Sequence, residues 1–260
     1  MTSSLEPILA FPPVDQLTNR RTDRVALKND TVDLWSSSLE ADASVLEYCR
    51  ACLSEEERTR AARFVRPEDQ LRFTVARGGL RVVLARYLGV EPAALRFQPG
   101  PTGKPALLDQ QGGPHVLRFN LSHSHGRMLV AVAKGQDIGI DLEQVRSNVE
   151  PLKLAERFYT QTEYDTIKSR PAAGHAVQFY RLWVAKEALL KAQGAGIAAL
   201  QQCEILVSDS SSRASVRLSG DSAMQPGWTV RWLSCGQDWQ GAVSAFGHDW
   251  SVRVLDAMSL

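Results

Sequence analysis

The sequence predicts an α+β protein whose two halves follow a similar order of elements. In each half helical segments are followed by antiparallel strands, with glycine, serine and aspartate between the strands. The hydrophobic fraction of 44% and the charged fraction of 23% are those of an ordinary globular chain of 260 residues. The sequence itself shows no internal repeat, so any symmetry between the halves would be structural only.

The first half is expected to hold an arm, two helices and short strands. Ser54 and Glu57 form a capping box, and the acidic residues there favour the positive end of a helix. A longer helix begins at Pro67, keeps an apolar face and ends at Gly89. The expected elements are an extended arm over residues 1–30, a strand over 32–35, helices over 54–65 and 67–88, and strands over 116–121 and 128–133.

The second half begins with a strand and continues through three helices into a region of strands. Thr160 and Glu163 repeat the capping-box pattern, and Gly194 ends the long helix. The expected elements are a strand over 138–142, helices over 151–158, from 160 and over 173–193, and strands over 203–208, 214–218, 228–233 and 240–246. The predicted division is therefore an arm (1–30), an N-terminal half (31–135) and a C-terminal half (136–260).

Charge and composition exclude several classes of protein. A net charge of +1 gives no reason to expect a nucleic-acid partner. Residues 1–13 contain no lysine or arginine and do not resemble a signal peptide, and no run approaches the roughly 20 apolar residues of a spanning helix. We therefore expect a cytoplasmic protein that does not enter a membrane. Cys49 and Cys52 form a single CxxC without the second pair of a zinc ribbon, which favours reduced structural thiols.

A pair of acidic residues lies on the strand predicted over 138–142. Asp141 and Glu143 are two positions apart, so both side chains point to the same face of the strand. Two adjacent carboxylates repel each other unless a cation lies between them, which makes the pair a candidate Mg²⁺ site. The alternative is a strand end that carries two solvated acids.

The long helix carries a second charged motif. Trp183, Glu187 and Lys191 are spaced by four residues and share one stripe, and Lys186 lies about 100° around the helix from Glu187. A stripe that contains tryptophan is expected to be covered, and covered charges need a partner. A metal ion with a bound anion would supply one, whereas the alternative is a surface Glu–Lys pair.

Two further segments have the chemistry of a phosphate site. Residues 119–126 place asparagine, serine and histidine directly between two apolar strands, where hydroxyl, imidazole and backbone donors could hold a phosphate. A Ser122–His123 nucleophile pair is disfavoured because neighbouring residues of a strand point to opposite faces. Lys104 lies between two turn residues, Gly103 and Pro105, on a stiff loop. A solvated turn and a surface lysine are the alternatives.

Together these segments resemble the Sfp-type 4′-phosphopantetheinyl transferases. That family carries (I/V)-G-(I/V)-D and, further along, W-x-x-K-E-(A/S)-x-x-K, which here are residues 138–141 and 183–191. Several other segments match family motifs in the expected order, namely 60–64, 103–105, 119–124 and 157–164. The resemblance covers roughly residues 54–196. It implies two pseudo-symmetric halves, each with a long helix packed on a small antiparallel sheet, and one active site between them.

The resemblance also implies roles for the acidic motifs. Asp141, Glu143 and Glu187 would bind Mg²⁺, or Mn²⁺ since both accept oxygen ligands, together with the pyrophosphate of coenzyme A. Lys186 and Lys191 would contact phosphates. Asp141, Lys186 and Glu187 would be catalytic, with Glu187, or a metal-bound water that it orients, as the base.

A second group of residues would bind the far end of coenzyme A. By resemblance, Ser122 and His123 would hold its 3′-phosphate, with Lys104 and Arg60 nearby. The sequence departs from the family at Glu57, where a basic residue is common. This departure concerns the contacts at the adenine end and leaves the predicted metal chemistry unaffected.

The activity implied by the resemblance is a Mg²⁺-dependent transfer. A serine of an apo acyl or peptidyl carrier protein would receive 4′-phosphopantetheine from coenzyme A, giving the holo-carrier protein and adenosine 3′,5′-bisphosphate. Fatty-acid, polyketide and non-ribosomal peptide carriers are all possible acceptors, and the enzyme would be a monomer. One alternative is a non-catalytic module that binds coenzyme A or a carrier protein on the same fold. An unrelated Mg²⁺ phosphohydrolase fits the carboxylates but not the other motifs.

Overall fold

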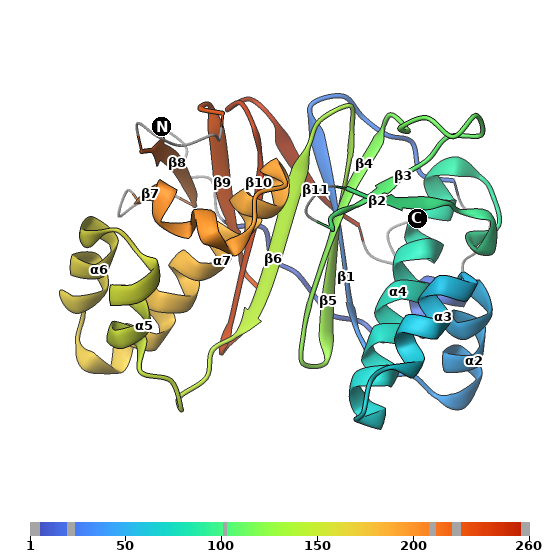
Figure 1. Ribbon diagram of the computed structural model, residues 1–260, viewed down its shortest axis with the longest axis horizontal. Coiled ribbons are helices and arrows are strands. Elements are labelled where there is room, and N and C mark those ends of the chain that lie inside the picture. The colour runs from blue at the N-terminus through green and yellow to red at the C-terminus, as the bar shows by residue number, and fades with distance from the viewer. Residues whose placement is uncertain (1–5, 20–23, 101–102, 208–211, 220–224, 256–260) are drawn as a thin grey trace.

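Of the three sheets in the described residues of the computed structural model, the two larger lie side by side, and helices flank them on the outside (Figure 1). The structure describes residues 6–19, 24–100, 103–207, 212–219 and 225–255. The α+β class predicted from the sequence is confirmed. Within the described residues, no helix is long and apolar enough to cross a membrane.

The first half contains four helices and five strands, counted over the described part of residues 1–135. Its strand β1 was expected to be shorter, and its helix α2 was not predicted. The elements are α1 (Asp15–Asn19), β1 (Thr31–Ser38), α2 (Ala43–Cys52), α3 (Glu55–Ala62), α4 (Pro67–Leu88), β2 (Phe97–Pro99), β3 (Pro105–Leu107), β4 (Leu117–Ser124) and β5 (Arg127–Lys134), with a 3₁₀ turn at Pro92–Ala94.

The second half follows the predicted order closely. Its last strand, β11, was not predicted. The elements are β6 (Ile138–Gln144), α5 (Pro151–Phe158), α6 (Gln161–Lys168), α7 (His175–Gln193), β7 (Cys203–Val207), β8 (Arg213–Leu218), β9 (Trp228–Leu233), β10 (Trp239–Phe246) and β11 (Ser251–Leu255), with 3₁₀ turns at Ala172–Gly174 and Ile197–Gln202.

Helix starts and ends follow the capping chemistry that the sequence predicted. Ser54 and Glu57 form the capping box of α3, and Thr160 and Glu163 form that of α6. Helices α4 and α7 both end at a glycine in the left-handed conformation, with φ of 65° at Gly89 and 67° at Gly194. Only glycine adopts this conformation at little cost, which explains why both long helices stop there.

The first sheet has the strand order β11-β1-β5-β4 and is covered by α4. Apolar residues of α4, among them Leu80 and Leu84, pack with Trp35 of β1 and Met128 of β5. Strand β11 runs parallel to β1, whereas the other pairs of this sheet are antiparallel. The predicted antiparallel sheet is therefore mixed. Because β11 comes from the C-terminal half, the division predicted at residue 136 does not coincide with the sheets at this end of the chain.

The second sheet has the order β6-β10-β9-β8-β7, is antiparallel throughout, and is covered by α7. Ala185 and Ala188 of α7 pack on Val230 and Trp232 of β9. The two sheets share a further core, in which β1 and β5 of the first sheet pack with β6 and β10 of the second. The halves thus form one continuous hydrophobic structure.

The N-terminal segment is less extended than expected. It contains the short helix α1, and its apolar residues Val14 and Leu17 are buried against the first-half core. Further upstream, Leu9 donates a backbone hydrogen bond to Ser234 of the second half. The segment therefore lies across both halves rather than forming a free arm.

Candidate active site

The site lies at the seam where edge strand β4 of the first sheet meets edge strand β6 of the second. No backbone ladder joins these strands, and polar side chains of β4 take its place. The Ile140 N–H donates to Asn120 Oδ1 at 2.9 Å, and the Leu142 N–H donates to Ser122 Oγ at 3.3 Å. The asparagine and serine of the 119–124 motif thus satisfy an edge strand whose donors would otherwise be buried without partners.

Helix α7 lies in direct contact with β6 at this seam. A Cβ atom on Gly139 would fall 1.9 Å from the carbonyl oxygen of Ala188 and 2.4 Å from the nitrogen of Ala192. Only glycine allows so close an approach of helix and strand. The approach brings Glu187 and Lys191 of α7 beside the carboxylates of β6.

Asp141 is the centre of the cluster and is 3% exposed. Its Oδ1 accepts hydrogen bonds from Ser122 Oγ at 2.8 Å and from Lys191 Nζ at 2.6 Å. Lys191 also donates to Ser122 at 3.3 Å. The structure therefore brings together Ser122, Asp141 and Lys191 from three elements, and Glu143 and Glu187 lie near enough to Asp141 to be affected by its charge.

The carboxyl groups of Glu143 and Glu187 both have a raised pKa. Burial, and then the charge of Asp141, raises the pKa of Glu143 above its usual value. The same two causes raise the pKa of Glu187, where Glu143 adds to the effect and Lys191 opposes it. The negative charge of Asp141 thus makes both glutamates harder to ionise, as expected for acids that share one site.

Two oxygens of the cluster are buried and have no hydrogen-bond partner: Asp141 Oδ2 and Glu187 Oε1. An unpartnered carboxylate oxygen is costly to bury, so these atoms fit the ligand set of a hard cation. The described residues nevertheless contain no group of three acidic, histidine or cysteine side chains already arranged to hold a metal. In this structure the Lys191 ammonium occupies Oδ1 of Asp141, and the Ser124 hydroxyl donates to Glu143 Oε2 at 2.8 Å.

Sequence reasoning missed Ser124. The signal was present, because Ser122 and Ser124 share one face of β4 in the same way that Asp141 and Glu143 share one face of β6. The two serines pair with the two acids one to one across the seam.

Lys186 lies elsewhere, and its predicted contact with phosphate and catalytic role do not fit the structure. Its side chain is fully buried and donates to Glu163 Oε2 at 2.5 Å and to the Cys203 carbonyl at 2.6 Å. An ammonium that is enclosed and already paired is not available to a ligand. The angle of about 100° between neighbouring helix positions places Lys186 in the core while Glu187 faces the seam.

Lys104 makes its hydrogen bonds within the protein, and its predicted contact with coenzyme A stays a prediction. Its Nζ donates to the carbonyls of Ile138 at 3.0 Å and Ala192 at 3.1 Å, at the start of β6 and the end of α7. It therefore lies at the seam between the halves. Its neighbours Gly103 and Pro105 line the large cleft described next.

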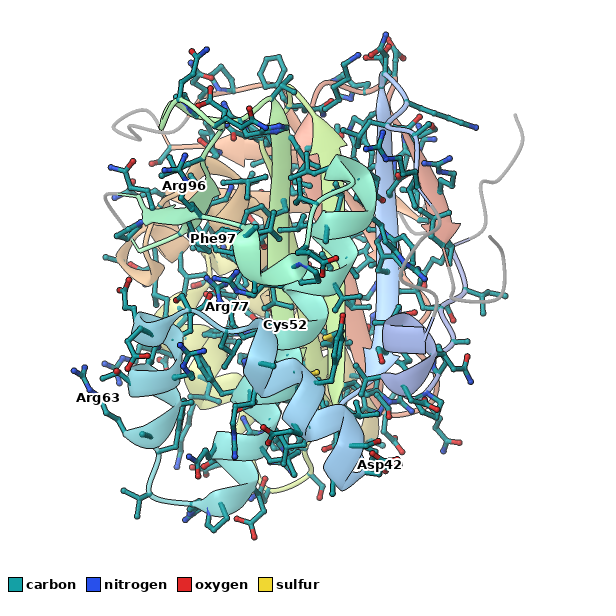
Figure 2. The ribbon with its side chains drawn as sticks, turned by 90° about the vertical axis from the view of Figure 1, so that its right-hand side faces the viewer. Asp42, Cys52, Arg63, Arg77, Arg96 and Phe97 are labelled. Carbon is teal, nitrogen blue, oxygen red and sulfur yellow. The ribbon has the colours of Figure 1, made fainter. Side chains whose placement is uncertain are left out.

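A cleft of about 1370 Å³ opens on the first half and contains Arg60 and His123. Ser122 and His123 lie on opposite faces of β4, so Ser122 joins the carboxylates while His123 faces the cleft. Figure 2 looks onto this side of the molecule and labels three arginines and a phenylalanine of its lining. Its wall is rich in arginine and phenylalanine, although Glu55, Glu56 and Glu57 line it too. The arginines and phenylalanines are Arg60, Arg63, Phe64, Phe73, Arg77, Arg81, Arg96 and Phe97.

Glu57 holds two arginines of this wall in place. Its carboxylate accepts from Arg77 Nε at 2.6 Å and from Arg81 Nε at 2.7 Å. Burial alone would raise the pKa of Glu57, but the Ser54 N–H and both arginines lower it below its usual value. The acidic departure from the family pattern is thus paired internally.

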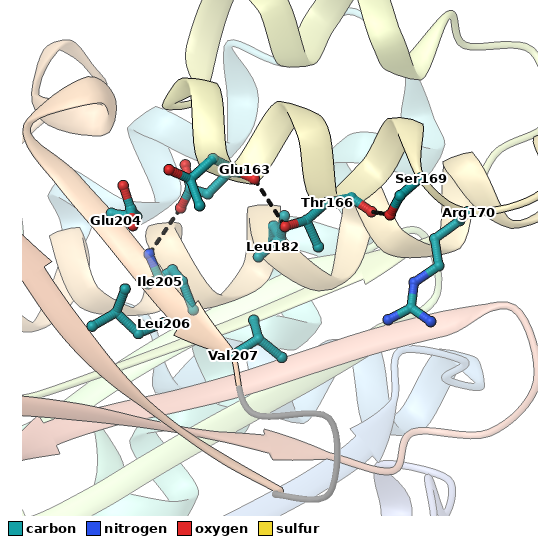
Figure 3. A pocket seen from close by; sticks show the side chains of 10 residues that line it. Glu163, Thr166, Ser169, Arg170, Leu182, Glu204, Ile205, Leu206 and Val207 are labelled. Atoms are coloured by element: carbon teal, nitrogen blue, oxygen red, sulfur yellow. Dashed lines mark hydrogen bonds between the residues drawn. The ribbon is translucent and has the colours of Figure 1, made fainter.

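A second cavity, of about 500 Å³, lies between α6 and β7 (Figure 3). Its wall includes Glu163, whose Oε1 accepts the Ile205 N–H at 2.9 Å, and the hydroxyls of Thr166 and Ser169. None of the residues predicted for the site lines it.

Comparison with known proteins defines the class of this protein. The family model for the N-terminal part of 4′-phosphopantetheinyl transferases matches residues 35–136, and the model for the 4′-phosphopantetheinyl transferase superfamily matches residues 137–243. The chain is 38% identical to the 4′-phosphopantetheinyl transferase HetI of Nostoc over 88% of its own length and 93% of that protein. The chain belongs to the 4′-phosphopantetheinyl transferase superfamily, and it transfers phosphopantetheine from coenzyme A to carrier proteins.

Other relatives match over a shorter stretch. A putative 4′-phosphopantetheinyl transferase of Synechocystis is 39% identical over 60% of this chain and 63% of its own length. The transferase Sfp of Bacillus subtilis is 32% identical over 56% of this chain and 62% of its own length. The resemblance expected from the sequence motifs is thus confirmed at the level of the family.

Proposed function

We propose that the carboxylate cluster at the seam is the active site, and that it works with Mg²⁺. The observation that carries this proposal is the pair of buried oxygens without partners, Asp141 Oδ2 and Glu187 Oε1. Asp141, Glu143 and Glu187 would hold the ion with the pyrophosphate of coenzyme A. When bound, the ion would neutralise charge on the pyrophosphate oxygens during transfer.

The other side chains then have distinct tasks. Lys191 is the partly exposed cation of the site, with 30% of its side chain open to solvent. Once a bound metal ion neutralises the carboxylate of Asp141, the ammonium of Lys191 is free to turn to a phosphate oxygen of coenzyme A. Ser122 and Ser124 keep Asp141 and Glu143 oriented through their hydroxyl hydrogen bonds.

The proposed reaction is an in-line displacement. The serine oxygen of the carrier protein attacks the β-phosphorus of coenzyme A and forms a new P–O bond. The bond to the bridging oxygen breaks, and adenosine 3′,5′-bisphosphate leaves with that oxygen. Glu187 takes the serine proton, and the raised pKa of its carboxyl makes it a stronger base than an exposed glutamate.

The basic cleft is the proposed site for the adenosine end of coenzyme A. Arg60 and His123 belong to its wall, and its phenylalanines offer faces on which a base could stack. A 3′-phosphate would meet arginines there rather than Ser122, which is engaged by Asp141. Monomeric state, cytoplasmic location and the absence of nucleic-acid and membrane partners stay predictions.

The test is intact-mass spectrometry of apo carrier proteins incubated with this protein, coenzyme A and Mg²⁺. Fatty-acid, polyketide and peptidyl carriers are each tried, and a gain of one phosphopantetheine that is lost with a chelator is expected. Asp141→Asn should reduce the rate by about 10²–10³-fold, since it removes a charge at the reacting phosphates. Asp165→Asn, the same change at an exposed position of α6, is the matched control and should leave the rate unchanged.

Two results would contradict the proposal. Modification that persists in the presence of chelator would show that the reaction needs no metal. Near-normal turnover of Asp141→Asn would show that the active site lies elsewhere. Binding of coenzyme A without modification of any carrier would favour the non-catalytic module instead.

A further inference from the structure

Lys104 joins two elements that carry the active-site groups. Its Nζ donates to the carbonyl of Ile138, the first residue of β6, and to that of Ala192, in the last turn of α7. Carbonyls in the last turn of a helix lack partners within the helix, and a cation there also suits the helix dipole. The side chain thus supplies what the end of α7 needs and ties it to the strand beneath.

This tie lies where helix and strand are closest. Ile138 is adjacent to Gly139, the residue whose missing Cβ allows the backbone of α7 to touch β6 at Ala188 and Ala192. Lys104 and the glycine therefore act at the same level of the seam. The glycine permits the close approach, and the lysine holds it from the side.

The two hydrogen bonds of Lys104 lie next to the reacting groups along both β6 and α7. Asp141 follows Ile138 by three positions on β6, and Lys191 directly precedes Ala192 on α7. The ion pair between Asp141 and Lys191, at 2.6 Å, joins these same two elements. A shift of α7 along β6 would change the spacing of Asp141, Glu187 and Lys191 together.

The backbone around Lys104 is itself held. The Gly100 N–H donates to the Lys104 carbonyl at 2.8 Å, and the Gly103 N–H donates to the Gly100 carbonyl at 2.9 Å. Gly103 and Pro105 line the basic cleft. Gly103 and Pro105 therefore face the cleft, while the side chain of Lys104 between them reaches the seam.

The surroundings of the ammonium are chiefly carbonyl groups. Burial lowers the pKa of Lys104 to about 8, with Asp137 opposing the effect and Arg118 adding to it. The two carbonyls hold the charged form in a place where burial disfavours it. This arrangement describes a side chain committed to the protein rather than one waiting for a ligand.

We propose that Lys104 is a positioning residue, which fixes α7 against β6 and thereby sets the spacing of Asp141, Glu187 and Lys191. The proposal rests on the proposed active site at the seam. It replaces the role suggested by the family resemblance, in which this lysine contacts coenzyme A.

The test compares Lys104→Met, which removes the donors but keeps the length of the stem, with Lys104→Arg, which keeps the charge and can donate to two carbonyls. The kcat of Lys104→Met should fall by about 10- to 100-fold, as expected when reacting groups lose their alignment by up to 1 Å. Its KM for coenzyme A should stay within about twofold of the native value, because no ligand contact is lost. Lys104→Arg should recover most of the kcat.

Two controls separate this role from the alternatives. Lys134→Met, at an exposed position of β5, should change neither constant, and Arg60→Met in the cleft should raise KM for coenzyme A. Hydrogen exchange of Lys104→Met should rise for backbone amides near 138–142 and 188–194 and remain native in α2 and α4. A general loss of stability would raise exchange throughout.

A rise in KM for coenzyme A with unchanged kcat in Lys104→Met would make the lysine a ligand and overturn the proposal. Native values of both constants would also overturn it. If Lys104→Met does not fold, Lys104→Arg decides by the same two constants. Failure of the proposed active site would be seen separately, as normal turnover of Asp141→Asn.

Discussion

Lys186 and Glu187 are neighbours in the sequence and have different environments in the structure. Glu163 receives three hydrogen bonds, from Lys186 at 2.5 Å, from its own capping partner Thr160 at 3.0 Å and from the Ile205 N–H at 2.9 Å. Lys186 is thereby joined to the start of α6 and to strand β7. The lysine of the W-x-x-K-E motif is a structural anchor of the second half.

Lys186→Met is therefore expected to destabilise the fold rather than to act on the chemistry. The change leaves Glu163 buried without its cation, and losing one member of such a pair costs about 3–5 kcal/mol of unfolding free energy. Urea denaturation measures the loss. The double variant Lys186→Met, Glu163→Gln should recover part of it, because the stranded charge is gone.

Lys191→Met is the matched control, since it removes an ammonium from the same helix at a partly exposed position. It also leaves the buried carboxylate of Asp141 without its cation, but at a site open to solvent on the lysine side, so it should lower stability less than Lys186→Met and activity more. Equal losses of unfolding free energy in both variants would show that the burial of Lys186 does not make its ion pair more important for stability.

At the scale of elements, the function depends on how closely α7 lies on β6. Gly139 sets that distance, because any Cβ there would fall 1.9 Å from the Ala188 carbonyl oxygen, an atom of the helix backbone that cannot rotate away. A side chain at this position has to push the helix from the strand.

Gly139→Ala should therefore lower the free energy of unfolding by about 1–3 kcal/mol through overpacking. Because the displacement separates Glu187 from Asp141, kcat should fall further than this loss of stability explains. Thermal melts and steady-state kinetics on carrier protein measure the two effects. Gly126→Ala is the control, since nothing lies within 4 Å of a Cβ built there. If Gly139→Ala and Gly126→Ala lost stability and kcat to the same extent, the close contact of α7 with β6 at Gly139 would not be the cause.

The elements themselves were largely predictable from the sequence. Both capping boxes and both terminal glycines were found because they are local signals that need no knowledge of the fold. Helix α2 was missed although Asp42 caps it and Val45, Cys49 and Cys52 share one helical stripe. Strand β11 was missed because its pairing with β1 is set by residues far away in the sequence.

The site was predictable where a motif fixes both the residue and its direction. Asp141 and Glu143 share a strand face by period, and the helix stripe places Glu187 with Lys191. The hydrogen-bond partners of Lys104 and Lys186 were not predicted, because they depend on which elements lie nearby. The carbonyls of Ile138, Ala192 and Cys203 that receive them become visible only in the fold.

At the scale of the molecule, the two halves are anchored in a similar way. In each, the glutamate of a capping box reaches a buried cation on the following long helix: Glu57 to Arg81 and Glu163 to Lys186. Each cation also donates to the backbone of the chain that follows its helix, Arg81 to two carbonyls and Lys186 to one. This correspondence supports the pseudo-symmetry expected from the family, which stays a prediction.

Stability as a function of pH should report on the crowded carboxylates. The pKa of Glu187 is raised in the folded protein, first by burial and then by Asp141, above an ordinary value of 4.5. The folded state therefore binds this proton more tightly than the unfolded state does. The resulting stability is present below the ordinary value and is lost as pH rises through the folded pKa.

Glu187→Gln should accordingly raise the melting temperature at pH 7 in the presence of a chelator, where about 1 kcal/mol corresponds to about 2–4 °C. The difference from the native protein should shrink as pH falls below the ordinary value. Added Mg²⁺ should reverse the order, because only the native site gains from binding the ion. A variant that is less stable at pH 7 with chelator would contradict the proposed repulsion.

The parallel pairing of β11 with β1 has a consequence for biosynthesis. Thr31 and Ser251 lie side by side although 220 positions separate them in the chain. During translation, β1 leaves the ribosome early with one edge open, and it cannot be covered until residues 251–255 have been made. Contacts of such long range slow folding, and an open edge invites pairing with other chains. A nascent chain halted before residue 251 thus exposes the unpaired edge of β1, and chaperone binding and aggregation should begin there.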